Sequence, residues 1–286
     1  MSESAVQEFQ EWREAWRRFK RNRAAVVALG LFLVIVFLAI FADWIAPFDP
    51  LKTKVAPSRL PPSRDHLFGT DQVGRDIFSG VIHGTRTGLL VGIISTLISV
   101  TIAIIIGILA GYLGGTVDMV IMRIVEILLS IPPFIFAMTI VILYGVRLPI
   151  IILVIGLLSW PTLARIVRAE VLSLKEREFV MAIRSVGASD FNIVFDEVLP
   201  NALPPLIPAA TLQVATAILF EAALSFLGFG DPNVASWGKS LWIAQQALYA
   251  GKWWPVIFPG VFIVLTALSF SVVGDGLNDA LNPKLR

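Results

Sequence analysis

Cysteine is absent from this 286-residue chain, and charged residues are scarce. Without cysteine there can be no disulfide, no thiolate nucleophile and no cysteine-based metal site. Asp, Glu, Lys and Arg make up 15% of the residues, whereas soluble domains carry about 25%. The net charge is +2 and the basic residues are scattered, which argues against nucleic acid as a partner.

Apolar residues make up 56% of the chain, and its mean hydropathy is +0.80. A helix needs about 20 apolar residues to cross a bilayer, and six segments meet this requirement. The sequence therefore predicts an all-α membrane protein whose transmembrane domain covers residues 24–275. The expected spans are 24–44, 88–113, 117–144, 149–170, 203–227 and 253–274.

Several of these spans have features that refine the prediction. Ala24–Ala42 carries no charge and no Ala-x-Ala cleavage site follows it, so we expect a retained span rather than a signal peptide. Pro132 and Pro133 interrupt the third span, and Pro161 lies within the fourth. Prolines inside spans are typical of kinks that neighbouring helices tolerate.

Six spans place both termini on one side, and the distribution of Lys and Arg indicates which side. With the termini inside, inner segments hold 14 basic residues and outer segments hold 9, an excess that agrees with the positive-inside rule. We therefore expect a cytoplasmic tail at 276–286 and external loops at 45–79 and 228–254. Four tryptophans would then form an outer interfacial belt: Trp237, Trp242, Trp253 and Trp254.

The first 23 residues predict an interfacial helix. The stretch EFQEWREAWRRFKRNR repeats aromatic side chains at helical spacing with Arg and Lys between them, a pattern typical of helices that lie on the inner leaflet. The aromatic residues are Phe9, Trp12, Trp16 and Phe19. The simplest interpretation is an anchor that sets orientation.

The longest predicted cytoplasmic loop, 171–201, contains REFVMAIRSVGASDFNIVFDEVLPN. Its pattern predicts two short helices, Glu178–Val186 and Asp190–Leu199, separated by a turn at Gly187. Ser189 is placed to cap the second helix, and Asp190 suits its positive N-terminus.

Apolar side chains are too frequent in this loop for a segment surrounded by water: Phe179, Met181, Ile183 and Val186. An exposed apolar face on a short helix favours a protein partner. The alternative is that the face packs back on the membrane bundle. Periodicity alone leaves both open.

The same loop resembles the Glu-Ala-Ala…Gly…Leu-Pro signature of permeases from binding-protein-dependent ABC importers. Met181 stands at the signature Glu, Ala182 and Ile183 at the two alanines, Gly187 at the glycine, and Leu199-Pro200 at the end. The resemblance implies a cytoplasmic coupling helix that docks on an ATPase subunit. The residues it assigns to ATPase coupling are Glu178, Met181, Ala182, Ser185, Val186, Gly187, Ala188, Ser189 and Asp190.

Further motifs resemble C-type permeases of the dipeptide/oligopeptide subfamily, from about Trp16 to the end of the chain. They are HLFGTDQVGRDIFSGVIHGTRTGLLVG, RIVEILLSIPPF, EAALSFLGFG and GDGLNDALNP. The resemblance implies the six-helix type I ABC importer permease fold, with an N-terminal interfacial helix, in the cell membrane. It also implies a homologous second permease, two ATPase subunits or domains and an extracytoplasmic solute-binding protein. ATP and Mg would be bound by the ATPases, with no cofactor in this chain.

Candidate catalytic and metal sites are weak. WGKS (Trp237–Ser240) echoes a phosphate-binding loop, but Asn233 replaces the required glycine and no strand precedes it. His66 and His83 lack metal-ligand spacing and lie in or beside the outer loop, away from any Ser–His–Asp arrangement. We expect no metal site and no enzymatic activity.

Glu221 is the one charge deep within a span, so it should face the bundle interior or a watery cavity. It could line a pathway or pair with a partner, or serve as an interhelical hydrogen-bond anchor, the reading we favour. Arg123 and Glu126 lie one helical turn apart and are expected to pair.

A secondary transporter is the main alternative class, although such proteins often show inverted repeats and an intramembrane ion relay. A membrane-embedded enzyme would need a catalytic constellation that the sequence does not offer. The resemblance favours peptides as the substrate, with oligosaccharides second; relatives also carry nickel and glutathione.

Overall fold

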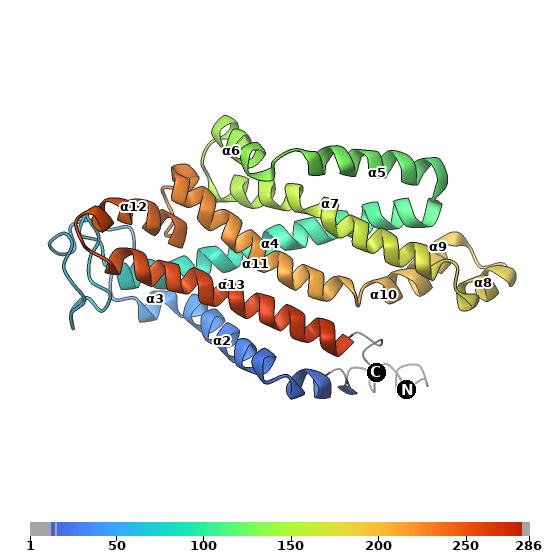
Figure 1. Cartoon of the computed structure of the whole chain (residues 1–286), viewed down its shortest axis with the longest axis horizontal. Coiled ribbons are helices and arrows are strands. Elements are labelled where there is room, and N and C mark those ends of the chain that lie inside the picture. The colour runs from blue at the N-terminus through green and yellow to red at the C-terminus, as the bar shows by residue number, and fades with distance from the viewer. Residues whose placement is uncertain (1–12, 15, 282–286) are drawn as a thin grey trace.

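The computed structural model describes residues 13–14 and 16–281, the last by its backbone only, and these are almost entirely helical (Figure 1). No strand occurs among them beyond one isolated bridge between Thr70 and Asp76. The helices in chain order, with π-helical turns labelled η, are α2 (Arg23–Ile40), α3 (Ala42–Ile45), α4 (Ile77–Ile108), η1 (Leu109–Leu113), α5 (Gly115–Ser130), α6 (Pro133–Tyr144), α7 (Leu148–Leu174), α8 (Glu178–Ser185), α9 (Asp190–Asn192), η2 (Ile193–Val198), α10 (Leu199–Ala202), α11 (Leu206–Leu224), η3 (Ser225–Phe229), α12 (Trp237–Tyr249) and α13 (Trp254–Leu281).

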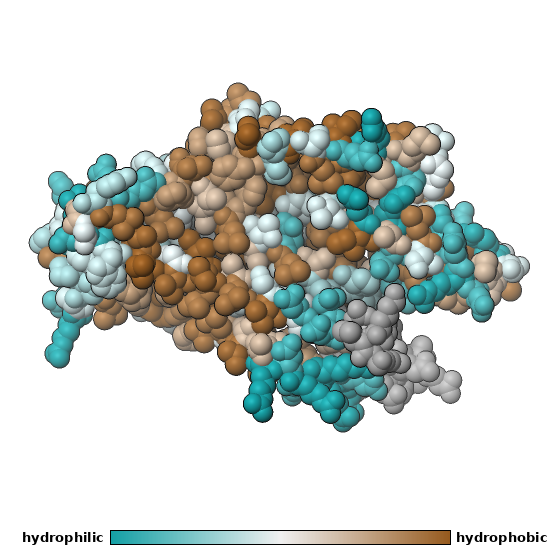
Figure 2. Space-filling view, in the orientation of Figure 1, coloured by the Kyte–Doolittle hydropathy of each residue, from teal (hydrophilic) through white to brown (hydrophobic). Residues whose placement is uncertain are grey.

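Five of the described helices are long and apolar enough to cross a membrane, and the bent pair α5–α6 brings the number to six if it is one span. Figure 2 shows apolar residues over the middle of the bundle and polar residues toward its two ends. Each backbone N–H and C=O in hydrocarbon must be bonded within the protein, which helices achieve without a partner segment.

Helices α4 and α7 pack closely because glycines remove side chains from their contact. A Cβ on Gly107 would lie 2.6 Å from Val167 Cβ, and one on Gly111 would lie 2.8 Å from Val171 Cβ. On the other helix, a Cβ on Gly156 would lie 2.9 Å from Ile98 Cβ. Small residues at such positions let helix backbones approach in a membrane, where dispersion contacts replace the hydrophobic effect between helices.

The third expected span is broken. Helices α5 and α6 meet at an angle of 82° across Pro132, so the proline pair makes a sharp elbow rather than a mild kink. Pro161, in contrast, lies within a continuous α7. Along α5, Arg123 and Glu126 form the expected ion pair at 3.2 Å.

The predicted start of the second span lies too far along the chain. Helix α4 begins at Ile77 rather than Gly88, because its polar first turns are buried against protein instead of ending the helix. Asp76 caps it by accepting the N–H of Ser79, and Thr87 Oγ1 donates to the carbonyl of Ala235 at 2.7 Å. Helix α13 also runs beyond its expected end, to Leu281.

The predicted tryptophan belt is wrong for two of its four members. Trp237 is 1% exposed and Trp254 is 6% exposed, whereas Trp242 and Trp253 are half exposed. The Trp237 ring fills the space beside Gly84 and Gly88, and its Nε1 donates to the carbonyl of Val81 at 2.9 Å. This ring therefore fastens α12 to α4 and does not face headgroups.

The N-terminal segment is helical at residues 16–21, but its aromatic side chains are not all exposed. Trp16 is 49% exposed, while Phe19 is buried against Ala25 and Ala280. Phe19 therefore holds the segment on α2 and α13. Phe9 and Trp12 lie outside the described residues.

We expect Gly107→Ala to lower the thermal unfolding midpoint of the detergent-purified protein by several degrees, since an added methyl group meets Val167 with no space to yield. Gly260→Ala is the matched control, because a Cβ there has no atom within 4 Å. Its midpoint should stay level or rise slightly, as alanine favours helix. Equal midpoints for the two variants would contradict the close α4–α7 contact.

Candidate functional site

The 171–201 loop projects from one end of the bundle, between the long helices α7 and α11 (Figure 1). It carries α8, α9, η2 and α10. The expected helices at Glu178–Val186 and Asp190–Leu199 therefore exist in outline, the second one divided by a π-helical turn. All nine candidate coupling residues lie on this projection.

Helix α8 has charges that suit its dipole, with Glu178 in the first turn and Arg184 in the last. Val180 is fully buried against the bundle, in the apolar cluster that includes Val171 and Leu174. Ile183 packs on the same cluster. This part of the helix face packs back on the membrane bundle.

The rest of the apolar surface stays in the open. Met181 is 50% exposed and Val186 is 84% exposed, and two rings of the next segment are exposed as well: Phe191 at 68% and Phe195 at 49%. These two rings lie 4.4 Å apart between centroids. The two alternatives for the loop thus apply to different residues: one set packs inward and the other remains uncovered. We call the uncovered set, Phe179, Met181, Val186, Phe191 and Phe195, the exposed apolar surface.

A turn at Gly187 connects the two helices. Its φ of +89° is the left-handed region that glycine enters at low cost, and a Cβ there would meet no atom within 4 Å. The Oγ of Ser189 then accepts the N–H of Asn192 at 3.3 Å, which is the expected cap. Ser185 Oγ donates back to the carbonyl of Met181 at 2.8 Å.

One residue of this site was missed by the sequence patterns. Tyr112, in the π-helical turn η1, donates its hydroxyl hydrogen to Asp190 Oδ1 at 2.5 Å. Arg184 Nη2 donates to the same hydroxyl oxygen at 3.1 Å. Tyr112 is separated from these partners by more than 70 positions, so no local spacing connects them.

Two further contacts brace the base of the loop. Lys175 Nζ donates to the carbonyl of Gly111 at 2.9 Å. Arg168 of α7 forms a two-pronged ion pair with the carboxylate of Asp118 of α5. Such forked geometry fixes orientation as well as distance, so the starts of α5 and of the loop are held together.

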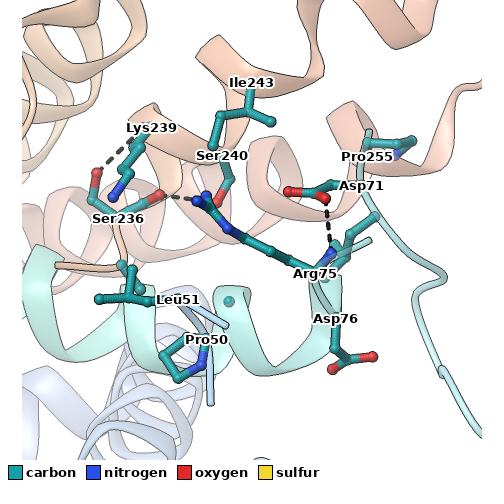
Figure 3. A pocket seen from close by; sticks show the side chains of 13 residues that line it. Pro50, Leu51, Asp71, Arg75, Asp76, Ser236, Lys239, Ser240, Ile243 and Pro255 are labelled. Atoms are coloured by element: carbon teal, nitrogen blue, oxygen red, sulfur yellow. Dashed lines mark hydrogen bonds between the residues drawn. The ribbon is translucent and has the colours of Figure 1, made fainter. Parts of the chain in front are cut away.

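A pocket lies at the opposite end of the bundle, between the segment before α4 and the start of α12 (Figure 3). Arg75 extends into it toward Ser240. Burial raises the pKa of Asp71, although this carboxylate accepts the N–H of Arg75 at 2.9 Å. Burial, and after it the nearby charge of Arg75, lowers the pKa of Lys239.

Lys239 belongs to the WGKS stretch, which forms the first turn of α12 behind the capping residue Ser236. Its Nζ donates to the carbonyls of Pro232 and Val234 at 2.5 and 3.2 Å. The lysine therefore closes its own loop, and the stretch has the geometry of a helix start and not of a phosphate-binding loop.

The histidine of the outer segment also holds structure. His66 Nδ1 lies 2.8 Å from Asp76 Oδ1, while Asp76 Oδ2 accepts both the N–H and the Oγ–H of Ser79. The carboxylate is in the middle, so the imidazole does not contact the hydroxyl as a general base would. Among the described residues, no group of three His, Asp or Glu is placed to hold a metal ion.

Glu221 faces the bundle interior, with 2% of its surface exposed. Ser225 Oγ donates to its Oε1 at 2.6 Å, one turn further along the same chain segment. The described part of the chain places no basic group within ion-pair distance of it. These contacts favour a hydrogen-bonded anchor over a charge paired within this chain.

Residues 103–286 match the family described as binding-protein-dependent transport system inner membrane component, and residues 10–62 match the N-terminal TM domain of oligopeptide transport permease C. The chain belongs to this permease family. The permease is 44% identical to the dipeptide transport system permease protein DppC of Escherichia coli (strain K12), over 96% of this chain and 93% of the relative. It is 39% identical to the oligopeptide transport system permease protein OppC of Bacillus subtilis (strain 168), over 96% and 90%.

The fold of the permease is similar to that of a chain in the inward-facing MetNI methionine ABC transporter. The TM-score is 0.58 at 24% identity, and the match covers 72% of this chain and 98% of the other. The expected all-helical fold of type I ABC importer permeases is confirmed, and the chain is a multi-pass subunit of that transporter class.

Proposed function

We propose that this permease forms half of a membrane pathway for peptides and that ATPase subunits drive it through the 171–201 loop. The observation that carries the proposal is the exposed apolar surface at the tip of the projecting loop. Val186 is 84% exposed and Phe191 is 68% exposed, although both are apolar, and both belong to the loop that projects from the end of the bundle (Figure 1). Such a surface favours a protein partner.

The geometry of the loop supports docking of a helix into a groove. Helix α8 presents Met181 and Ala182 on its outer side, while Val180 fixes its inner side. Methionine adapts to irregular apolar surfaces, and the small Ala182 lets a partner approach the helix backbone. Glu178, Ser185, Ala188, Ser189 and Asp190 border this surface and complete the proposed contact. ATP and Mg would be bound by the docked ATPases, and this chain would perform no chemistry.

One bundle provides only part of a pathway, so we propose a homologous second permease beside it, two ATPase subunits or domains, and a solute-binding protein at the far end. Peptides are the proposed substrate because the relatives named above are dipeptide and oligopeptide permeases. Oligosaccharides remain the second candidate. In this arrangement both termini and the 171–201 loop are cytoplasmic, and residues 45–79 and 228–254 face outward.

Replacing Gly187 should separate ATP hydrolysis from transport. Gly187→Val forces a β-branched residue into a left-handed conformation at a φ of +89°, which reorients α9 against α8. Gly187→Asn is the matched control, since asparagine tolerates this conformation. We expect the valine variant to insert in the membrane but to retain less ATPase on co-purification, with transport reduced at least about tenfold. Normal assembly and uptake with valine would contradict the docking role.

The absence of cysteine allows the orientation to be tested without background labelling. In intact cells, Ser63→Cys should react with a membrane-impermeant maleimide, while Ser185→Cys should react only after the membrane is opened. Both serines are exposed, so access to reagent depends on the side of the membrane. The reverse labelling pattern would invert the proposed topology.

Reconstitution distinguishes the proposed importer from a secondary transporter. Liposomes containing this chain, its second permease and the ATPases should accumulate a labelled dipeptide only with ATP and the loaded binding protein. Liposomes with this chain alone are the control and should show no uptake under a proton or sodium gradient. Gradient-driven uptake by the lone chain would refute the importer. Uptake of oligosaccharide, but not dipeptide, by the full set would overturn the substrate proposal alone.

A further inference from the structure

Most of the contact between the 171–201 loop and the spans is apolar. Val180, Ile193 and Val198 share one buried apolar cluster with residues of α7, Val171 and Leu163 among them. Apolar contacts are non-directional and depend mainly on buried area. They hold the loop against the bundle, but they do not determine which span moves when α8 is displaced.

Directional contacts between the helix pair and the spans converge on one side chain. Within the described residues 176–201, the side-chain hydrogen bonds that leave this segment all end on Tyr112. Its hydroxyl donates to Asp190 Oδ1 at 2.5 Å and accepts from Arg184 Nη2 at 3.1 Å. Arg184 also lies over the Tyr112 ring, 5.8 Å from its centroid, and 3.9 Å from Asp190.

These two partners lie on either side of the Gly187 turn. Arg184 is in the last turn of α8 and Asp190 is the first residue of α9. A single hydroxyl therefore contacts both helices and fixes the angle between them. Charge-assisted hydrogen bonds of this kind are shorter and stronger than neutral ones.

Tyr112 is in turn placed where two spans join. It belongs to η1, the π-helical turn that ends the long α4 helix, and Gly114 with a φ of +66° leads from there into α5. Isolated π-helical turns are rare in proteins, but those that occur often lie at functional sites. Lys175 fastens the same turn through the carbonyl of Gly111, and Asp118 pairs the start of α5 with Arg168 of α7.

We propose that Tyr112 is a positioning residue that transmits movement of the 171–201 loop to the junction of α4 and α5. The inference rests on the proposed coupling of this loop to ATPases. A displacement of α8 and α9 pulls on the hydroxyl, and the hydroxyl pulls on η1. Helix α5, the first half of the broken span, then moves together with the loop.

Tyr112→Phe tests the proposal, because it keeps the ring and its contact with Arg184 while removing the hydroxyl. We expect the full complex in liposomes to hydrolyse ATP at close to the normal rate but to import about tenfold less dipeptide per ATP. An effect of about tenfold is the size expected when one hydrogen bond to a charged carboxylate is lost. Tyr249→Phe is the matched control, since Tyr249 is 94% exposed in α12 and should change nothing.

Two more variants separate transmission from stability. Because Asp190 also borders the proposed ATPase contact, its variants are compared in complexes that retain the normal amount of ATPase. In these complexes Asp190→Ala should lower the dipeptide-to-ATP ratio as much as Tyr112→Phe, and the double variant should lower it no further. Asp190→Asn keeps an acceptor oxygen and should recover most of the ratio. An unchanged ratio in Tyr112→Phe, or equal falls in hydrolysis, transport and thermal midpoint, would overturn the role of Tyr112 and leave the importer intact. If the unmodified complex transports without ATP, the proposed function itself fails.

Discussion

The close approach of α4 and α7 is the contact on which the other parts of this permease depend. Gly107, Gly111 and Gly156 remove the side chains that would separate the two backbones. In hydrocarbon, where lipid tails are as apolar as the helix surface, such close packing has to supply the attraction itself. The turn η1 follows directly from the end of α4, and the 171–201 loop follows from the end of α7. The relative position of these two functional segments is therefore set by one glycine-lined interface.

The spans and the helix pair of the loop could be predicted from the sequence because their signals are local. Long apolar runs mark spans, and a serine, an aspartate and a glycine at the right spacing mark the cap and turn around Gly187. The start of α4 could not be predicted from hydropathy, since its polar residues Ser79 and Thr87 are buried in hydrogen bonds with protein. The partners of these residues lie elsewhere in the chain, and periodicity carries no information about them.

The same reason explains the two larger differences. Tryptophan is common at membrane interfaces, but Trp237 is buried because two glycines of α4 leave room for its ring. Tyr112 became part of the candidate site through folding of α4 against the loop. Both results depend on contacts between distant segments, and no pattern within either segment distinguishes them from an ordinary interfacial or lipid-facing aromatic residue.

The elbow between α5 and α6 has a consequence for the surroundings of this subunit. At about 1.5 Å per residue, 16 residues of α5 extend about 24 Å and 12 residues of α6 extend about 18 Å, so neither alone crosses a 30 Å hydrocarbon layer. Pro133 has no N–H to offer the carbonyl of Leu129, and a small hollow opens beside it, next to Leu158 and Pro161. Carbonyl groups that lack a hydrogen-bond partner are excluded from contact with lipid tails by their desolvation cost. The elbow therefore identifies a side of the bundle that acyl chains cannot solvate, and this side has to be covered by protein or water whenever the subunit is in a bilayer.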